Sequence, residues 1–136
     1  METKPKLSPG NLKDHIKMAA LAVQGLSPEV ALDLAGRLGV SQERLSELAQ
    51  IAKTTLHRRM KEHQTLAQDE SERVIRLFGL YQRAVEVFDD EERATKWFSS
   101  HPKALGGKTP LEFMETEPGS RYVEKLLGRI EQGVFS

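Results

Sequence analysis

The strongest constraint on the fold of this 136-residue chain is a run of apolar residues in its middle, spaced three or four apart. The run covers about four helical turns and consists of Val74, Leu77, Phe78, Tyr81, Val85 and Phe88. This spacing predicts one long helix whose continuous apolar face must be buried by other elements. Asp69 and Glu72 have the spacing of a capping box, so we expect the helix to begin there.

Shorter apolar stripes with helical spacing flank this run on both sides, and each is bounded by helix start or stop signals. In the first stripe, which Gly25 should end, the inward residues are expected to be Leu12, Ile16, Ala19, Ala20 and Val23. Asp89 and Glu92 are expected to cap the helix that carries Trp97. No segment alternates with period two, so the predicted fold class is all-α with short connections.

Composition narrows the classes of function. The chain has 20 basic and 20 acidic residues, which excludes a strongly basic nucleic-acid coat but leaves room for a local basic patch. Residues 1–66 hold ten basic and seven acidic side chains, and residues 67–136 hold ten and thirteen, so the first half is better suited to a polyanion. Without cysteine, a signal peptide or a membrane-length apolar run, a cytoplasmic protein is expected.

Residues 41–63 have the length and pattern of a helix-turn-helix, with a break near Gln50 and Ile51. The second helix carries the candidate DNA-binding residues Lys53, Thr54, Thr55, His57, Arg58, Arg59 and Lys61. The first three are candidates for contact with base edges, and Arg58, Arg59 and Lys61 for contact with phosphates. A solvated basic face that complements the helix dipole is the alternative, and Gln50 stands where such turns often have glycine.

The stretch from Trp97 to Gly119 predicts a rigid loop between two helices. Gly106 and Gly107 permit positive φ. Thr109, Pro110 and Glu112 supply a cap, a first-turn proline and a reciprocal cap for a short helix, and Thr116 can cap the next helix. A loop fixed in this way is suited to recognition by a partner, although the same residues could simply build the turn.

No pattern of catalytic or metal-ligating residues is recognisable. His57 and His63 are six residues apart and do not share a helical face, and the acidic run 89–92 suits a helix start. No nucleophile is paired with a base, and Gly106-Gly107 lacks the surroundings of a phosphate loop. The sequence therefore predicts neither an enzyme nor a bound metal or cofactor.

Taken together, these residues resemble the type II antitoxins of the Xre/MbcA/ParS family. The resemblance is carried over residues 67–136 by Ala94-x-x-Trp97-Phe98, Pro102, Leu105-Gly106-Gly107-x-Thr109-Pro110-Leu111, Thr116-x-x-Gly119, Val123 and Leu126-Leu127-x-x-Ile130-x-x-Gly133. Residues 26–66 resemble the Xre-type helix-turn-helix of the same proteins, through Thr55-Leu56-x-Arg58-Arg59. Residues 1–25 carry none of these residues and stay unassigned.

The resemblance implies an all-α chain with a helix-turn-helix domain at 26–66 packed beside a toxin-binding domain at 67–136. It implies an antitoxin that neutralises a cognate toxin, commonly of the NAD-consuming RES-domain class, and represses its own operon as a homodimer on operator DNA. In the family the chain's end can lie over the toxin's active-site cleft. The implied toxin-facing residues are Leu105, Gly106, Gly107, Lys108, Thr109, Pro110, Arg129, Gln132, Gly133, Val134 and Phe135.

Two alternatives stay open at this point. A stand-alone regulator would sense a ligand or protein through its C-terminal half, and would be expected to have a buried pocket with polar groups there. An adaptor would bind only protein, and would give no DNA shift at low salt.

Overall fold

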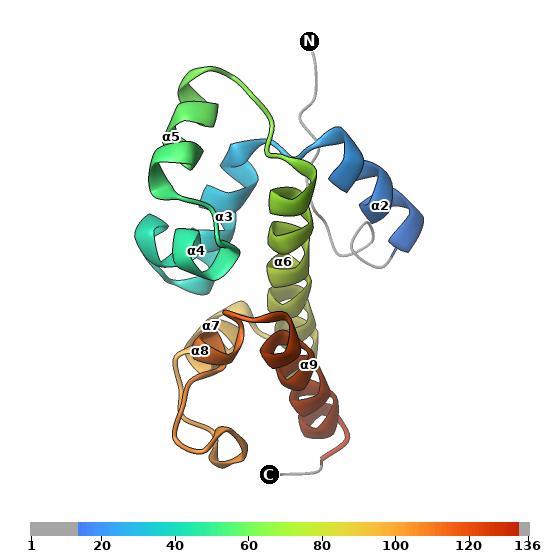
Figure 1. Cartoon of the computed structure of the whole chain (residues 1–136). Helices are drawn as coiled ribbons and strands as arrows, with labels where there is room; N and C mark the ends of the chain where they lie inside the picture. The colour runs from blue at the N-terminus through green and yellow to red at the C-terminus, as the bar shows by residue number, and fades with distance from the viewer. Residues whose placement is uncertain (1–13, 134–136) are drawn as a thin grey trace.

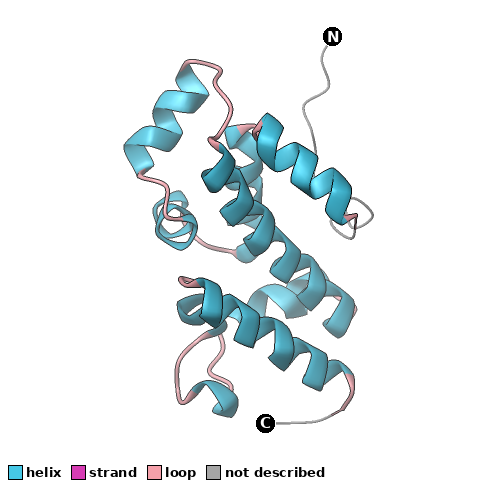
Figure 2. Cartoon of the chain, turned by 45° about the vertical axis from the view of Figure 1, so that its right-hand side comes forward, coloured by secondary structure: helices cyan, strands magenta, loops and turns pink. Residues whose placement is uncertain are grey.

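Helix α6, Gln68–Phe88, runs through the middle of the molecule and contacts helices from both ends of the chain (Figure 1). The computed structural model describes residues 14–133, and that part of the chain contains helices and connecting loops but no strand (Figure 2). The all-α prediction is confirmed. On α6 the residues Val74, Leu77, Phe78 and Tyr81 are buried as predicted, while Val85 and Phe88 are partly buried.

The start of α6 differs from the expected capping box. The Ala67 N–H donates to the Glu70 carboxylate at 2.8 Å, so the helix begins at Gln68. Asp69 lies in the first turn and pairs with Arg73 at 3.4 Å instead of capping. The reason is tertiary: Leu66 is buried and its N–H donates to the carbonyl of Leu26 at 2.8 Å, which fixes the chain just before the helix.

Four helices from the N-terminal half surround the first part of α6. They are α2 (His15–Gln24), α3 (Pro28–Leu38), α4 (Gln42–Ala49) and α5 (Lys53–Lys61). In Figure 1, α2 lies on one side of α6, and α3, α4 and α5 lie on the other. Leu34, Leu38, Leu45, Leu48 and Leu56 are buried between them and belong to the core.

Helix α2 is rotated relative to the expectation from its sequence. Met18 and Ala22 are its buried residues, whereas Ile16 is 84% and Val23 69% exposed, so the predicted inward stripe was wrong. Leu12 lies outside the described residues. Gly25 ends α2 as predicted, and it lies so close to Leu66 that an added Cβ would be 2.6 Å from the carbonyl oxygen of that residue. Helix α2 packs on α6 through the face that carries Met18 and Ala22.

The C-terminal half adds α7 (Glu91–Phe98), the short 3-10 helix η1 (Lys103–Leu105), α8 (Pro110–Phe113) and α9 (Glu117–Glu131). Helix α7 is capped by Asp90, which accepts from the Glu92 N–H at 3.3 Å. The expected cap, Asp89, instead ends α6 in the left-handed conformation at φ 53°. The cap therefore moves one residue along, because the turn between α6 and α7 needs Asp89.

Both halves share a single apolar core. One cluster of buried side chains runs from Leu26 through α3, α6 and α7 to Leu127 in α9. Within it Tyr81 stacks on Phe98, and the half-buried Trp97 packs against Phe88 and Phe98 with ring centroids 5.8 and 5.4 Å away. Tyr81 and Phe98 thus belong to the core, Phe88 and Trp97 pack against it, and the helices of the two halves are held in one packed body. None of the helices within residues 14–133 combines the length and apolar character that crossing a membrane requires.

Candidate functional site

Helices α4 and α5 form the helix-turn-helix that the sequence predicts. Ser41 caps α4 by accepting from the Arg44 N–H at 3.0 Å. Gln50 then takes the left-handed conformation at φ 54°, in the place where glycine is common. Such a conformation costs a non-glycine residue on the order of 1 kcal/mol. Arg73 of α6 offsets part of this cost, because its guanidinium donates to the carbonyls of Ala49 at 2.7 Å and Gln50 at 3.2 Å.

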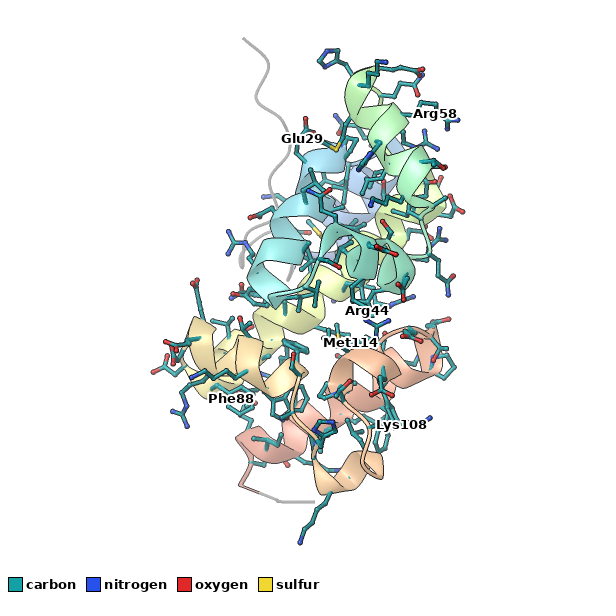
Figure 3. The ribbon with its side chains drawn as sticks, turned by 90° about the vertical axis from the view of Figure 1, so that its left-hand side faces the viewer. Glu29, Arg44, Arg58, Phe88, Lys108 and Met114 are labelled. Atoms are coloured by element: carbon teal, nitrogen blue, oxygen red, sulfur yellow. The ribbon has the colours of Figure 1, made fainter. Side chains whose placement is uncertain are left out.

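Five polar side chains share the exposed face of α5. They are Lys53, Thr54, His57, Arg58 and Lys61, at positions i, i+1, i+4, i+5 and i+8 of the helix. The face is cationic, and no ion pair joins these residues to a carboxylate within residues 14–133. Figure 3 shows Arg58 pointing outward from α5. We call this surface the α5 face; it is the part of the helix-turn-helix that is free to meet a polyanion.

Arg59 and Thr55 lie away from the α5 face. The Arg59 guanidinium pairs with Glu70 of α6 at 3.1 Å and donates to the carbonyl of Thr65 at 3.2 Å. Both partners of this ion pair are mostly buried, with side-chain exposures of 20% and 13%. Thr55 is partly buried. The expectation that Arg59 contacts phosphate is therefore corrected: Arg59 fastens α5 to the start of α6.

The loop between η1 and α8 has a buried base and an exposed tip. Leu105 and Pro110 are buried, so they hold the loop and do not offer a contact surface, contrary to the expectation for both. Gly106, Gly107 and Lys108 are exposed and form the tip. Both glycines have positive φ, at 63° and 89°, and an added Cβ would meet nothing within 4 Å, so the backbone conformation and not space requires glycine there.

The predicted capping box at the start of α8 is confirmed. The Glu112 N–H donates to Thr109 Oγ1 at 3.2 Å, and the Thr109 N–H donates to the Glu112 carboxylate at 3.3 Å. Thr109 is itself partly exposed beside the tip. Thr116 caps α9 as predicted, accepting from the Gly119 N–H at 3.0 Å. These two caps hold the loop in one conformation.

The end of α9 is fixed to α6. Arg83 makes two hydrogen bonds to the Glu131 carboxylate, at 2.9 and 2.6 Å, and this contact raises the pKa of Arg83. Arg129, Gln132 and Gly133 are exposed around this end. Val134 and Phe135, which were expected to dock on a partner, lie outside the described residues. For this end of the chain the structure gives the direction of α9, the helix that precedes these two residues in the sequence.

The loop tip and the end of α9 lie at one end of the molecule, remote from α5 (Figures 1 and 2). Figure 3 likewise shows Arg58 in the upper part of the molecule and Lys108 in the lower part. The two sets of candidate residues thus form two separate surfaces on one packed body, and a partner could occupy either without covering the other.

The sequence did not predict the contacts that join the helix-turn-helix to the C-terminal helices. Arg44 of α4 pairs with Glu115, which follows α8, at 2.6 Å. The Gln50 side-chain amide donates to the backbone carbonyl of Glu115 at 3.2 Å. No local signal marks contacts between residues so far apart in the chain. Among residues 14–133 no group of three histidines or carboxylates is placed to hold a metal ion.

Two protein-family models match the chain. The antitoxin Xre-like helix-turn-helix domain covers residues 17–79, and the antitoxin Xre/MbcA/ParS C-terminal toxin-binding domain covers residues 83–133. The models meet inside α6, the helix that packs against both halves. The boundary expected near residue 66 therefore stays a prediction.

The curated proteins that are similar to this chain include an antitoxin from each of the three organisms named below. An "Antitoxin Xre" of Yersinia enterocolitica is 32% identical over 126 residues, which is 92% of this chain and 81% of that protein. An "Antitoxin Xre" of Photorhabdus laumondii is 38% identical over 69 residues, covering 50% of this chain and 47% of the relative. A "Prs ADP-ribosylating antitoxin" of a Sphingobium species is 28% identical over 108 residues, covering 73% and 68%.

The similarity to the Yersinia protein runs through both halves, and each half matches its own family model. The architecture agrees, since a helix-turn-helix is packed against a helical C-terminal unit with a rigid exposed loop. This chain therefore belongs to the Xre family of type II antitoxins, which join an Xre-like helix-turn-helix to a C-terminal toxin-binding domain.

Proposed function

We propose that this antitoxin neutralises an NAD-consuming toxin of the RES-domain class and represses its own operon by binding operator DNA as a homodimer. The observation that carries the proposal is the separation of two exposed surfaces on one packed body: the α5 face, and the loop tip with the end of α9. One protein can then hold DNA and toxin at the same time.

For DNA, the first turn of α5 supplies the base-reading residues. Lys53 and Thr54 are exposed at its start, where recognition helices approach base edges, whereas Thr55 is partly buried and lies away from that face. His57, Arg58 and Lys61 follow on the same face and would contact phosphates. Helix α5 has no side-chain cap at Ala52, so the N–H groups of its first turn are also suited to a phosphate oxygen.

For the toxin, the exposed members of the predicted set form the contact. Gly106, Gly107, Lys108 and the partly exposed Thr109 present a rigid tip, which costs little conformational entropy on binding. Arg129, Gln132 and Gly133 continue this surface at the end of α9, where Arg83 fixes the helix. Val134 and Phe135 follow directly and would enter the toxin's active-site cleft.

The NAD chemistry of the toxin rests on the family resemblance and on one relative. The name of the Sphingobium relative refers to ADP-ribosylation, a reaction that takes ADP-ribose from NAD. This name supports the NAD-consuming class for the partner of the present chain, and the RES domain is the member of that class that we propose.

Co-expression and promoter binding test the proposal together. Arg58→Ala should weaken binding to the operon's own promoter while cells that express the toxin still survive. Lys108→Glu should leave promoter binding unchanged, while cells that express the toxin no longer survive. Lys96→Glu, on the exposed side of α7, makes the same change of charge elsewhere and is the control. Loss of both activities in one folded variant would contradict the division of labour. No promoter shift even at low salt would favour an adaptor that binds only protein.

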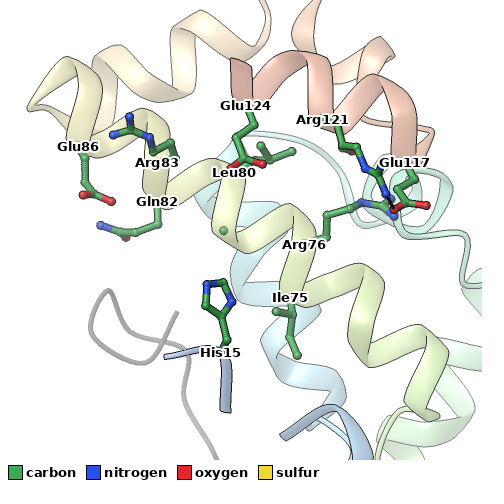
Figure 4. Close-up of a pocket in the computed structure, with 12 residues that line it drawn as sticks. His15, Ile75, Arg76, Leu80, Gln82, Arg83, Glu86, Glu117, Arg121 and Glu124 are labelled. Atoms are coloured by element: carbon green, nitrogen blue, oxygen red, sulfur yellow. Dashed lines mark hydrogen bonds and ion pairs between the residues drawn. The ribbon is translucent and has the colours of Figure 1, made fainter. Parts of the chain in front are cut away.

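A stand-alone regulator with a ligand-sensing C-terminal half finds less support. It calls for a buried pocket with polar groups, whereas the groove between α6 and α9 is open to solvent and lined largely by charged side chains (Figure 4).

A further inference from the structure

Helix α2 presents an apolar stripe to solvent. Ile16 and Val23 are two turns apart and 84% and 69% exposed, and they are the only large hydrophobic residues exposed to this degree within residues 14–133. Ala19 and Ala20 are exposed between them, and their small side chains let another backbone approach closely. An amphipathic helix normally buries such residues, so a stripe left in water on a short packed helix indicates a contact surface.

An open groove of about 650 Å³ adjoins this stripe. His15, the first residue of α2, forms one wall, and α9 forms the opposite wall (Figure 4). Its floor is the outer side of α6 at Ile75, Gly79 and Leu80. Gly79 leaves the floor open, because a Cβ added there would meet nothing within 4 Å. A ridge of apolar side chains and a groove with an apolar floor therefore lie next to each other on one side of the molecule.

The charges around the groove are balanced. Three arginines and three glutamates line it: Arg76, Arg83, Arg121, Glu86, Glu117 and Glu124. Arg121 pairs with Glu117 at 2.6 Å. Arg76 is different, because its buried Nε has no hydrogen-bond partner and burial lowers its pKa. DNA carries only negative charge, so its charge is not complementary to this mixture of arginines and glutamates. A second copy of this surface carries the same mixture, and a twofold rotation can bring opposite charges of the two copies together.

We propose that this face is the homodimer interface. In the dimer, the apolar stripe of α2 (Ile16, Ala19, Ala20 and Val23) from each copy lies in the groove of the other copy. The inference rests on the homodimer of the proposed function and assigns its surface. An isologous contact requires a self-complementary patch, and an adjoining ridge and groove with balanced charges meet that requirement. The face lies across α6 from α5 in Figures 1 and 2, so a dimer formed here leaves the α5 face and the loop tip uncovered.

Sedimentation equilibrium of the full-length chain over a wide range of concentration tests the assignment. The wild-type chain is expected to be a dimer. Ile16→Glu places a charge in the ridge and Gly79→Leu fills the groove. Each should weaken dimerisation by at least about tenfold. Gly79→Leu should not impair folding, since Gly79 is inside a helix with open space above it. Circular dichroism and thermal unfolding verify this.

Two matched controls separate the interface from general effects. Gln24→Glu adds the same charge to α2 beside the stripe, and Gly36→Leu adds the same leucine to an exposed helical glycine of α3, where a Cβ also meets nothing within 4 Å. Both should dimerise as the wild type does.

The outcomes distinguish the two proposals. A monomeric wild-type chain would remove the homodimer itself and this interface with it. A wild-type dimer that Ile16→Glu and Gly79→Leu leave intact would leave the homodimer standing and overturn only the surface assigned here. An intact dimer of these variants that no longer retains the toxin on co-purification would assign the face to the toxin instead.

Discussion

Arg44 and Glu115, 71 residues apart in the chain, form an ion pair of 2.6 Å between the helix-turn-helix and the C-terminal helices. The same glutamate accepts, through its backbone carbonyl, a hydrogen bond from the Gln50 side chain in the turn between α4 and α5. Glu115 also follows α8, the helix that begins at the proposed toxin-binding loop. The turn that orients the recognition helix is thus connected directly to the end of the unit that carries the loop.

A double-mutant cycle on Arg44 and Glu115 should therefore give a small coupling. The side chains are 27% and 42% exposed, so solvent screening limits the interaction to about 0.5–1 kcal/mol of unfolding free energy. Arg44→Gln, Glu115→Gln and the double variant, measured by urea unfolding, give the value. The pair Arg121 and Glu117, at 72% and 59% exposure, is the control and should give about 0.3 kcal/mol. Equal couplings in the two cycles would mean that the first pair does not join the halves.

The left-handed turn at Gln50 predicts a strong dependence on side-chain shape. Gln50→Val should lower the unfolding free energy by about 1–2 kcal/mol, because a β-branched residue tolerates positive φ poorly. Gln50→Asn should cost much less, since asparagine adopts this conformation readily. Chemical denaturation measures both. A tolerated Gln50→Val would show that the turn is not held at positive φ in solution.

How much of this could be predicted from the sequence depended on the distance between the residues involved. The buried positions Val74, Leu77, Phe78 and Tyr81 of α6 and the caps at Thr109 and Thr116 were predicted correctly, because periodicity and capping involve residues only a few positions apart. The capping boxes at Asp69 and Asp89 were misplaced by a turn or less, because several carboxylates compete near each helix start. Here the packing of Leu66 and the left-handed Asp89 decided the outcome.

The same distinction between neighbouring and distant residues holds for the candidate site residues. The sequence placed Lys53, Thr54, His57, Arg58 and Lys61 among the polar residues of α5, but it grouped Thr55 and Arg59 with them and could not reveal that Glu70 holds Arg59. The rotation of α2 and the pairing of Arg83 with Glu131 depend on contacts between remote segments, for which one sequence contains no signal.

Arg58 and Arg59 are adjacent in the chain, but we expect their alanine variants to lose different properties: DNA binding for Arg58→Ala and stability for Arg59→Ala. Arg58→Ala should weaken DNA binding at all sequences and reduce the slope of log affinity against log salt by about 1, with stability unchanged. Arg59→Ala breaks a mostly buried ion pair and leaves Glu70 without it, so it should destabilise the fold by about 1–3 kcal/mol. Fluorescence anisotropy at several salt concentrations and thermal unfolding separate the two effects. A stable Arg59→Ala variant with the reduced salt slope would return Arg59 to the phosphate contacts.

Gly119 and Gly128 make the sharpest pair of substitutions in the C-terminal half. Both lie in α9, yet a Cβ at Gly119 would sit 1.8 Å from the carbonyl oxygen of Phe113, while one at Gly128 would meet nothing within 4 Å. Gly119→Ala must therefore push α9 away from α8, and should cost about 3 kcal/mol or more and weaken toxin binding along with stability. Gly128→Ala should instead stabilise the fold by about 0.5–1 kcal/mol, because alanine is the better helix former. Thermal unfolding of the two variants and co-purification with the toxin measure both effects. A Gly119→Ala variant as stable as Gly128→Ala would mean that α8 and α9 do not meet as closely as this structure has them, and the rigid loop would lose its support.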